Sequence, residues 1–238
     1  MSSIAWHNGQ YVEPNRSTVR MREFVSRVLA EDEQPGEVLE GGCGAGAKML
    51  QLSDLFPQAR WTGVDLDEEP VRAGQERLDP QRFTLLQGNL HELEQTFGTQ
   101  RFDISFSIMT LSWMEDYEHV VEQMLAVTRK WLFIFSLFSD TQVDAFIRIV
   151  GRMPGTQEGL RSFYNVYSLP RFLRFCHKLG ATEAVTEPFE IDLDLPRPDH
   201  GGMGTWTVGT ADGRRLQFSG PLSMPWWFVA VRAPVGGS

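Results

Sequence analysis

The sequence contains few cysteines and no long apolar run. Its 238 residues include two cysteines, Cys43 and Cys176, which excludes a disulfide framework, and no cluster of cysteine and histidine has zinc-site spacing. No apolar stretch approaches the roughly 20 residues that span a bilayer. The first residues also lack the basic and apolar segments of a signal peptide. These absences predict a protein of the reducing cytoplasm, with neither a metal ion nor a membrane as partner.

Basic residues are also fewer than acidic ones. The chain has 22 lysines and arginines against 31 aspartates and glutamates, which gives a formal net charge of −9. Proteins that follow a phosphate backbone usually carry a basic face, so this balance argues against nucleic acid and favours a small-molecule substrate. With 42% hydrophobic residues, the chain can bury one large core, and we expect a single domain.

Strand-like and helix-like patterns alternate through the first half of the chain. Apolar runs typical of buried strands cover residues 37–41, 61–65, 83–87, 102–108 and 131–136. Helical spacing of apolar residues covers residues 17–31, 49–55, 68–78, 91–97 and 120–125. Such alternation predicts an α/β fold with a doubly wound, mostly parallel sheet.

The pattern changes after residue 138. Apolar residues at 143, 146, 147 and 150 predict a helix, and Ser168 and Pro170 open another helix that Gly180 closes. The remainder is rich in strand patterns, with a β-hairpin over 205–219 around Asp212 and Gly213 and a last strand over 226–232. The hairpin offers an edge on which a second copy of the chain could pair, so a homodimer is an open expectation.

Residues 36–46 carry the most specific signal. An apolar strand ends at Glu40, and glycines follow at alternate positions, Gly42, Gly44 and Gly46. Glycine permits positive φ and lets a ligand approach the backbone closely. One interpretation is a dinucleotide site of an NAD-dependent oxidoreductase, because residues 42–47 fit the G-x-G-x-x-A pattern and Asp65 could bind a ribose. Another is a strand-to-helix turn that binds nothing.

The acid ahead of the glycines favours a third interpretation. A carboxylate at a strand end attracts a cationic amino group and repels a pyrophosphate. The string Glu40-x-Gly42-x-Gly44-x-Gly46 resembles the first motif of class I S-adenosylmethionine (SAM)-dependent methyltransferases. The second strand, which ends in Asp65, and the strand that begins at Phe102 also match that family.

The resemblance implies a Rossmann-like fold, a seven-stranded α/β sheet whose last strand is antiparallel, here with a C-terminal β-hairpin insertion. It implies SAM as cofactor and one domain over 1–238. Residues 1–35 would supply a lid and helix, 36–138 the cofactor-binding core, and 139–238 the acceptor-side helices, the hairpin and the final strand. The implied cofactor-binding residues are Glu40, Gly42, Cys43, Gly44, Gly46, Asp65, Leu66, Asn89, Leu90 and Ser107.

Three of these residues have roles implied by the family. Asp65 would accept hydrogen bonds from both ribose hydroxyls, which suits the two oxygens of a carboxylate, and Leu66 would pack on the adenine. Asn89 stands where the family usually has an aspartate that accepts from the adenine amino group. This is a departure from the family pattern, although an amide oxygen can still accept.

The acceptor is less clearly specified. Methyltransferases that modify nucleobase amines carry an Asn/Asp-Pro-Pro-Tyr/Phe string where this chain has residues 107–110, so we expect a different substrate, a hydroxyl of a sugar or secondary metabolite. A hydroxyl needs a base, and His200 beside Asp199 is the expected one. Alternatives that stay open are a protein or tRNA methyltransferase and a SAM-binding module without catalysis.

Aromatic residues suggest where the acceptor would bind. Trp113, Tyr164 and Tyr167 follow the fourth strand or lie in the C-terminal third, and we expect them to line an acceptor pocket. Ahead of the first helix, Tyr11 and Arg16 could fold over the cofactor, with Arg16 meeting its carboxylate.

Overall fold

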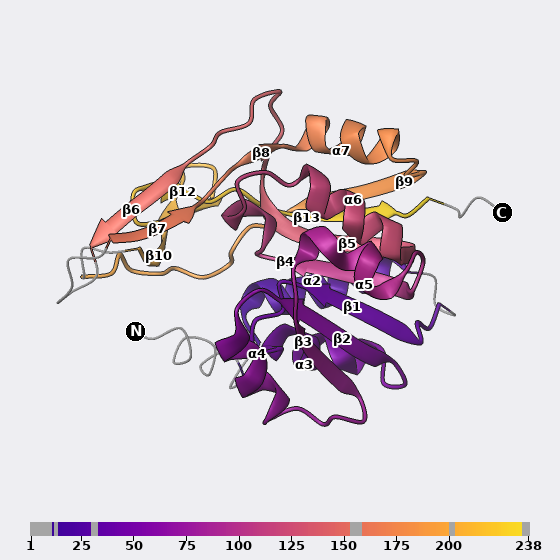
Figure 1. Cartoon of the computed structure of the whole chain (residues 1–238). Coiled ribbons are helices and arrows are strands. Elements are labelled where there is room, and N and C mark those ends of the chain that lie inside the picture. The colour runs from indigo at the N-terminus through magenta and orange to yellow at the C-terminus, as the bar shows by residue number, and fades with distance from the viewer. Residues whose placement is uncertain (1–10, 12–13, 30–32, 153–158, 200–202, 235–238) are drawn as a thin grey trace.

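A central β-sheet with helices on both faces organises the chain (Figure 1). The computed structural model describes residues 11, 14–29, 33–152, 159–199 and 203–234. In spatial order the sheet strands are β3 (Phe83–Gln87), β2 (Arg60–Asp65), β1 (Glu37–Gly41), β4 (Phe102–Ile108), β5 (Thr128–Ser139), β13 (Trp226–Arg232) and β9 (Glu183–Pro188), with the short β8 (Tyr167–Ser168) beside the end of β5.

The helices alternate with these strands. The α-helices are α2 (Arg16–Val28), α3 (Ala47–Leu52), α4 (Glu68–Gln75), α5 (Leu93–Phe97), α6 (Glu118–Val127) and α7 (Leu169–Lys178). Short 3-10 turns are η1 (Ser53–Leu55), η2 (Leu90–Glu92) and η3 (Leu111–Trp113). None of the helices in the described part of the chain has the length and apolar character needed to cross a bilayer.

The strand directions match the sequence prediction. Strand β1 pairs in parallel with β2 and β4, and β2 with β3 and β4 with β5 are likewise parallel. Strand β13 runs antiparallel to both β5 and β9. The mostly parallel sheet with an antiparallel last strand is therefore confirmed.

Two hydrophobic cores cover the two faces of the sheet. Helices α2, α3 and α4 close one face, where Phe24 of α2 stacks on Phe228 of β13 with ring centroids 5.5 Å apart. Helices α5, α6 and α7 close the other face. Successive residues of β1 separate accordingly, with Val38 in the first core and Leu39 in the second. Burial on both faces explains why the inner strands read as continuous apolar runs.

The predicted helix over residues 143–150 is wrong. Residue Ala145 instead forms a bridge with Val166, and β6 (Arg148–Arg152) pairs with β7 (Gly159–Phe163) as an antiparallel ribbon. Val143 and Phe146 are 67% and 66% exposed, so the apolar residues whose spacing suggested a helix do not pack on the core. Hydrogen bonds to a distant segment determine the backbone here, rather than local periodicity.

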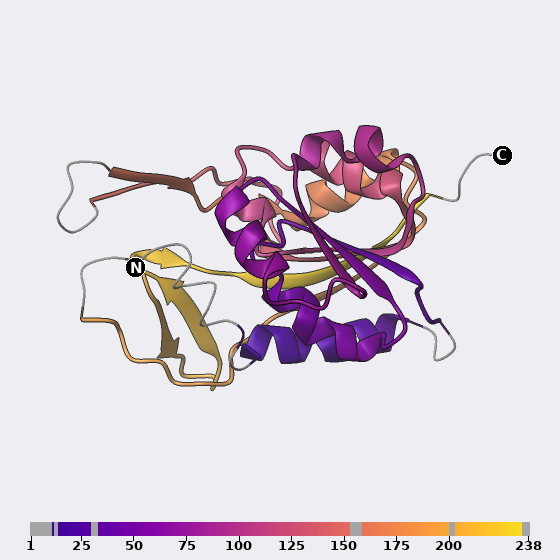
Figure 2. The ribbon, with the colours of Figure 1, turned by 60° about the horizontal axis from the view of Figure 1, so that its bottom comes forward.

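The ribbon and a second small sheet project from the carboxyl end of β5 (Figure 2). The second sheet contains β10 (Thr205–Gly209), β11 (Arg215–Ser219) and β12 (Leu222–Ser223). Its first two strands form the predicted hairpin, in which Trp206 and Phe218 face each other across the strands and stack at 4.6 Å. Both projections therefore flank the edge of the sheet at which β1, β2 and β4 also end.

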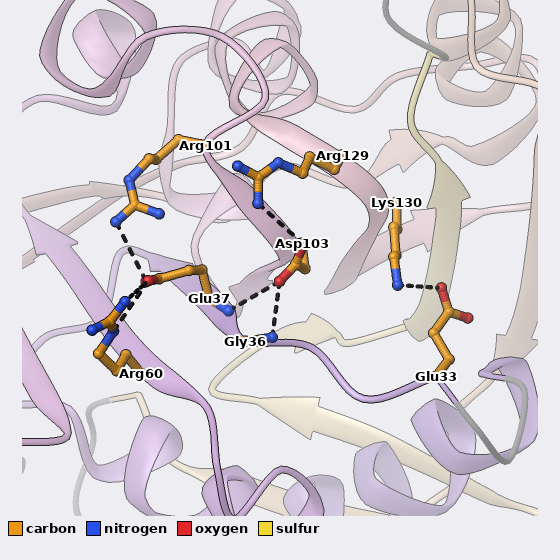
Figure 3. A network of polar contacts seen from close by, with 8 residues as sticks. All are labelled: Glu33, Gly36, Glu37, Arg60, Arg101, Asp103, Arg129 and Lys130. Atoms are coloured by element: carbon orange, nitrogen blue, oxygen red, sulfur yellow. Dashed lines mark hydrogen bonds and ion pairs between the residues drawn. The ribbon is translucent and has the colours of Figure 1, made fainter.

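An ionic network holds the opposite, amino-terminal edge of the sheet (Figure 3). The Asp103 carboxylate on β4 accepts from the backbone N–H groups of Gly36 and Glu37, at 2.8 and 3.1 Å, and from Arg129 at 3.2 Å. Partial burial alone would raise the pKa of Asp103, but these hydrogen bonds outweigh it and lower the pKa. Strands β1, β4 and β5 are thereby fixed to one another at their starts.

Replacing Asp103 with alanine should lower the free energy of unfolding by about 1–3 kcal/mol, because two backbone N–H groups lose their acceptor. Urea denaturation at neutral pH measures this loss. A matched control is Asp54→Ala, which removes a carboxylate that is 69% exposed and pairs with Arg22 at the surface; its effect should stay within about 0.5 kcal/mol.

The stabilisation by Asp103 should also depend on pH. Folding lowers its pKa, so its contribution is present above the ordinary pKa of 3.8 and disappears as the pH falls through the lowered value. The difference between wild type and Asp103→Ala should therefore shrink in acid. Equal losses for Asp103→Ala and Asp54→Ala at neutral pH would contradict this role.

Candidate functional site

The carboxyl ends of β1 and β4 meet at the first glycine of the loop. Gly42 has a φ of +77°, and its N–H donates to the Val64 carbonyl at 2.8 Å. A Cβ at this position would lie 2.3 Å from the Thr110 hydroxyl oxygen, just beyond β4. Only glycine satisfies both the positive φ and the close approach.

The glycine loop leads into α3, and its backbone faces the Asp65 carboxylate. Gly46 has a φ of +80° and stands immediately before α3. The Gly44 N–H donates to Asp65 Oδ2 at 2.7 Å, and the Asp67 N–H donates to the other oxygen at 3.0 Å. The carboxylate at the end of β2 is thus oriented from both sides, and each oxygen keeps a lone pair with which it can accept from a ligand.

Glu40, on β1, carries a buried carboxyl group. Its side chain is 1% exposed, and Oε2 has no hydrogen-bond partner within the described residues. Burial raises the pKa of Glu40 to about 8, against the opposing effect of the nearby Lys48 ammonium. A buried oxygen without a partner is costly, so a cationic donor that reached it would be strongly favoured.

Lys48 provides the nearby positive charge. It lies on α3, is 7% exposed, and donates to the Thr18 hydroxyl of α2 at 2.8 Å. Burial lowers the pKa of Lys48, while Glu40 acts in the opposite direction. We did not identify Lys48 from the sequence; the available signal was a lysine in the apolar stretch that follows the glycine loop.

The end of β4 adds a strained backbone to the site. Met109 has a φ of +59°, although it is not glycine, and its N–H donates to the Phe135 carbonyl at 2.7 Å. Non-glycine residues in this conformation cost free energy and are enriched at functional sites. Ser107, two residues earlier, is fully buried and its hydroxyl has no partner among the described residues. It therefore lies inside the sheet rather than at its open edge.

The residues expected around the adenine differ in exposure. Leu66 follows Asp65 and is 72% exposed, so an apolar surface is available beside the carboxylate. The Asn89 side chain accepts from the His91 N–H at 3.1 Å and caps η2, which leaves its NH2 group free of protein partners in the described structure. Leu90 and Cys43 are buried, and burial raises the pKa of the Cys43 thiol.

Two of the three aromatic residues expected in the acceptor pocket lie together. Trp113 of η3 and Tyr164 have ring centroids 4.7 Å apart, and Trp113 is 44% exposed. Tyr167 lies elsewhere: it is 1% exposed, packs on Tyr117 at 4.8 Å, and donates its hydroxyl to the Met114 carbonyl. The candidate wall of an acceptor pocket therefore consists of the first pair.

The two residues expected to close over the cofactor have different partners. The Tyr11 hydroxyl donates to the Ala45 carbonyl of the glycine loop, and the Arg77 guanidinium lies 4.9 Å from its ring centroid. Arg16 instead donates to Asp192 at 2.8 Å. Only Tyr11 reaches the loop. The expected base, His200, lies outside the described residues.

No group of three or more histidine, cysteine, aspartate or glutamate side chains in the described ranges has the arrangement of a metal site. The polar groups at the carboxyl edge are instead two carboxylates, Asp65 and Glu40, on neighbouring parallel strands. Beside them lie the N–H-rich glycine loop and the exposed Leu66. This donor set fits a ligand with hydroxyls, a cationic group and an apolar ring.

Comparisons with known proteins point to one family. A family model described as a methyltransferase domain matches residues 38–130. Trans-aconitate 2-methyltransferase of Deinococcus radiodurans is 32% identical over 228 residues, which cover 87% of this chain and 81% of the relative. Malonyl-acyl-carrier-protein O-methyltransferase of Chlorobium phaeovibrioides is 35% identical over 125 residues, 50% of this chain and 46% of the relative.

The chain spans about half the length of the first curated relatives that it matches, two malonyl-acyl-carrier-protein O-methyltransferases. Among solved structures, 1,6-didemethyltoxoflavin-N1-methyltransferase of Burkholderia thailandensis aligns with a TM-score of 0.56 and 16% identity. That alignment covers 97% of this chain and 84% of the other. At this identity the similarity establishes a shared fold.

The buried carboxyl group makes a prediction about the protein without ligand. Because folding raises the pKa of Glu40 from 4.5 to about 8, the folded state binds its proton more tightly than the unfolded state does. Stability should therefore fall as the pH rises from 4.5 towards 8. Glu40→Gln removes this titration, so its free energy of unfolding relative to wild type should increase between pH 6 and pH 8.5 in urea titrations. A pH-independent difference would contradict a raised pKa at Glu40.

Proposed function

The chain belongs to the class I SAM-dependent methyltransferases, a family whose cofactor is SAM, and from this premise we propose that it methylates an oxygen of a small-molecule acceptor. The leading acceptor is a hydroxyl of a sugar or secondary metabolite. The observation that carries the cofactor part of the proposal is the position of Asp65 and the buried Glu40 near the carboxyl ends of two neighbouring parallel strands, with Asp65 hydrogen-bonded to the glycine loop.

Each carboxylate suits a different part of SAM. Asp65 is oriented by the Gly44 and Asp67 N–H groups and can accept from two vicinal ribose hydroxyls. Glu40 Oε2 can accept from the cationic amino group of the methionine part. Leu66 offers an apolar surface for the adenine, beside the amide of Asn89.

The dinucleotide interpretation is weaker on the same geometry. A pyrophosphate over the glycine loop would bring negative charge towards the Glu40 carboxyl and would offer no cationic donor to its unpartnered oxygen. A sulfonium cofactor with an ammonium group meets attraction at the same place. The electrostatics of the loop therefore support SAM.

Methyl transfer from a sulfonium is an in-line displacement with an activated donor, so the protein mainly aligns the acceptor and excludes water. Trp113 and Tyr164, beyond the end of β4, are suited to this role. A hydroxyl acceptor also needs a base, and His200 beside Asp199 stays our proposal for it. A carboxylate acceptor is the second candidate, because two relatives are named for acids, trans-aconitate and the malonyl group.

Asp65→Ala should weaken SAM binding by about 10- to 100-fold, since charge-assisted hydrogen bonds to the ribose are lost. Isothermal titration calorimetry with SAM, and separately with NAD, measures this effect. Asp67→Asn is the matched control, because Asp67 caps α4 by accepting from the Glu69 N–H and an amide oxygen preserves that cap. Tighter binding of NAD than of SAM by the wild type would contradict the proposal.

The acceptor class can be tested with methyl-labelled SAM and a panel of sugars, phenols and small carboxylic acids. A methylated hydroxyl is an ether that survives mild alkali, whereas a methylated carboxylate is an ester that releases methanol. We expect an alkali-stable product. Tight binding of SAM without turnover of any panel member would instead favour a binding module without catalysis.

With any acceptor found, Trp113→Ala should raise the acceptor KM several-fold and leave the Kd for SAM unchanged, because Trp113 packs on Tyr164 rather than on the glycine loop. Trp206→Ala is a matched control, since Trp206 packs within the separate small sheet. Equal effects of the two substitutions on the KM would contradict a specific role of Trp113.

A further inference from the structure

A cavity opens beyond the starts of α6 and α7, and nothing in the proposed methyl transfer uses it. Its volume is about 340 Å³, and its walls come from the segment before α6, the segment after β5, and α7. Three aromatic rings and three carboxyl groups dominate the lining: Tyr117, Phe146, Tyr167, Asp116, Glu118 and Asp144. This volume suits a small organic molecule.

The charge of the lining is negative. Arg171, also in the wall, pairs with Asp144 at 3.2 Å, and Asp144 further accepts from the Ser168 N–H at 2.7 Å. Asp116 and Glu118 pair with no cation within the described ranges. Glu118 stands in the first turn of α6. The cavity therefore offers two carboxylates that are free to bind a positive charge.

The Tyr117 hydroxyl supplies an independent sign of a ligand. The side chain is 94% buried, with 6% exposed, and its ring packs on Tyr167 at 4.8 Å and Phe172 at 5.2 Å. Its hydroxyl makes no hydrogen bond in the part of the chain that the structure describes, and it is not one of the fully buried polar atoms, so it is open to the cavity that the residue lines. Burial first, and then the charges of Asp144 and Glu118, raise the pKa of Tyr117, so it stays a neutral phenol that can accept from a ligand N–H.

The apolar part of the lining is formed by rings. Phe146 is 66% exposed and meets Tyr167 edge to face, with centroids 6.2 Å apart. The Tyr167 hydroxyl is already satisfied, since it donates to the Met114 carbonyl at 3.0 Å and accepts from Asn165 at 3.1 Å. Tyr167 therefore presents a ring, rather than a polar group, to a ligand. Aromatic faces attract cations as well as apolar groups.

We propose that this cavity binds a free small-molecule amine in its protonated form. The ammonium group donates to the carboxylates of Asp116 and Glu118 and to the Tyr117 hydroxyl, while the organic part lies against Phe146 and Tyr167. An anion meets repulsion from the two carboxylates, which are exposed, and a neutral molecule forms no ion pair with them. The site is separate from the Asp65 and Glu40 pair, and the proposal does not depend on the methyltransferase activity.

Calorimetric titration of the full chain with benzylamine tests the proposal, with benzyl alcohol as a neutral ligand of the same shape. Benzylamine should bind with one-to-one stoichiometry, and benzyl alcohol at least about tenfold more weakly. The double variant Asp116→Asn, Glu118→Gln should weaken benzylamine binding about tenfold or more. Asp140→Asn, which removes an exposed carboxylate that does not line the cavity, should leave binding unchanged.

Substitution of the apolar wall gives a second measurement. Phe146→Ala removes an exposed ring, so it should fold normally and weaken both ligands by a similar factor. The proposal is overturned if benzylamine shows no binding at millimolar concentration, or if benzyl alcohol binds equally well. It is also overturned if the double variant and Asp140→Asn behave alike.

Discussion

The burial of the Glu40 carboxyl at the end of β1 is the constraint on which the site depends. A carboxyl group in the sheet interior is tolerated only if it stays protonated or meets a positive charge. Lys48 of α3 supplies part of that charge, and Lys48 in turn donates to Thr18 of α2. The Lys48–Thr18 hydrogen bond thus joins the start of α3 to α2 near the buried carboxyl group. An unpartnered oxygen remains for a cationic ligand group.

The amino edge of the sheet contributes to stability, whereas the carboxyl edge carries the candidate site. At the amino edge, both carboxylate oxygens of Asp103 have donors, the Gly36 and Glu37 N–H groups on one and Arg129 on the other (Figure 3). At the carboxyl edge, polar groups stay partly unsatisfied and Met109 adopts a strained backbone. In open α/β sheets ligands bind at the carboxyl ends of the strands. The unsatisfied polar groups and the strained backbone cost folding free energy at this edge, and contacts with a bound ligand can offset that cost.

Local sequence predicted the central sheet because its strands are buried on both faces and read as apolar runs, as in β5. The glycine loop was equally predictable, since positive φ at Gly42 and Gly46 leaves few alternatives to glycine. The conformation of residues 143–150 was not predictable, because it depends on Val166 and Asn165, which lie far along the chain. No local pattern reports such pairing.

Side-chain partners in the site were predictable only in part. Motif positions such as Asp65 follow from the backbone that carries them, whereas Arg16 pairs with Asp192 across a large sequence distance that periodicity does not reveal. The proposed SAM site therefore depends on the geometry of the carboxyl edge. A crystal structure of the chain with S-adenosylhomocysteine tests it most directly. We expect both ribose hydroxyls at Asp65 and the amino group within hydrogen-bond distance of Glu40; a nucleoside bound away from Asp65 would contradict the account.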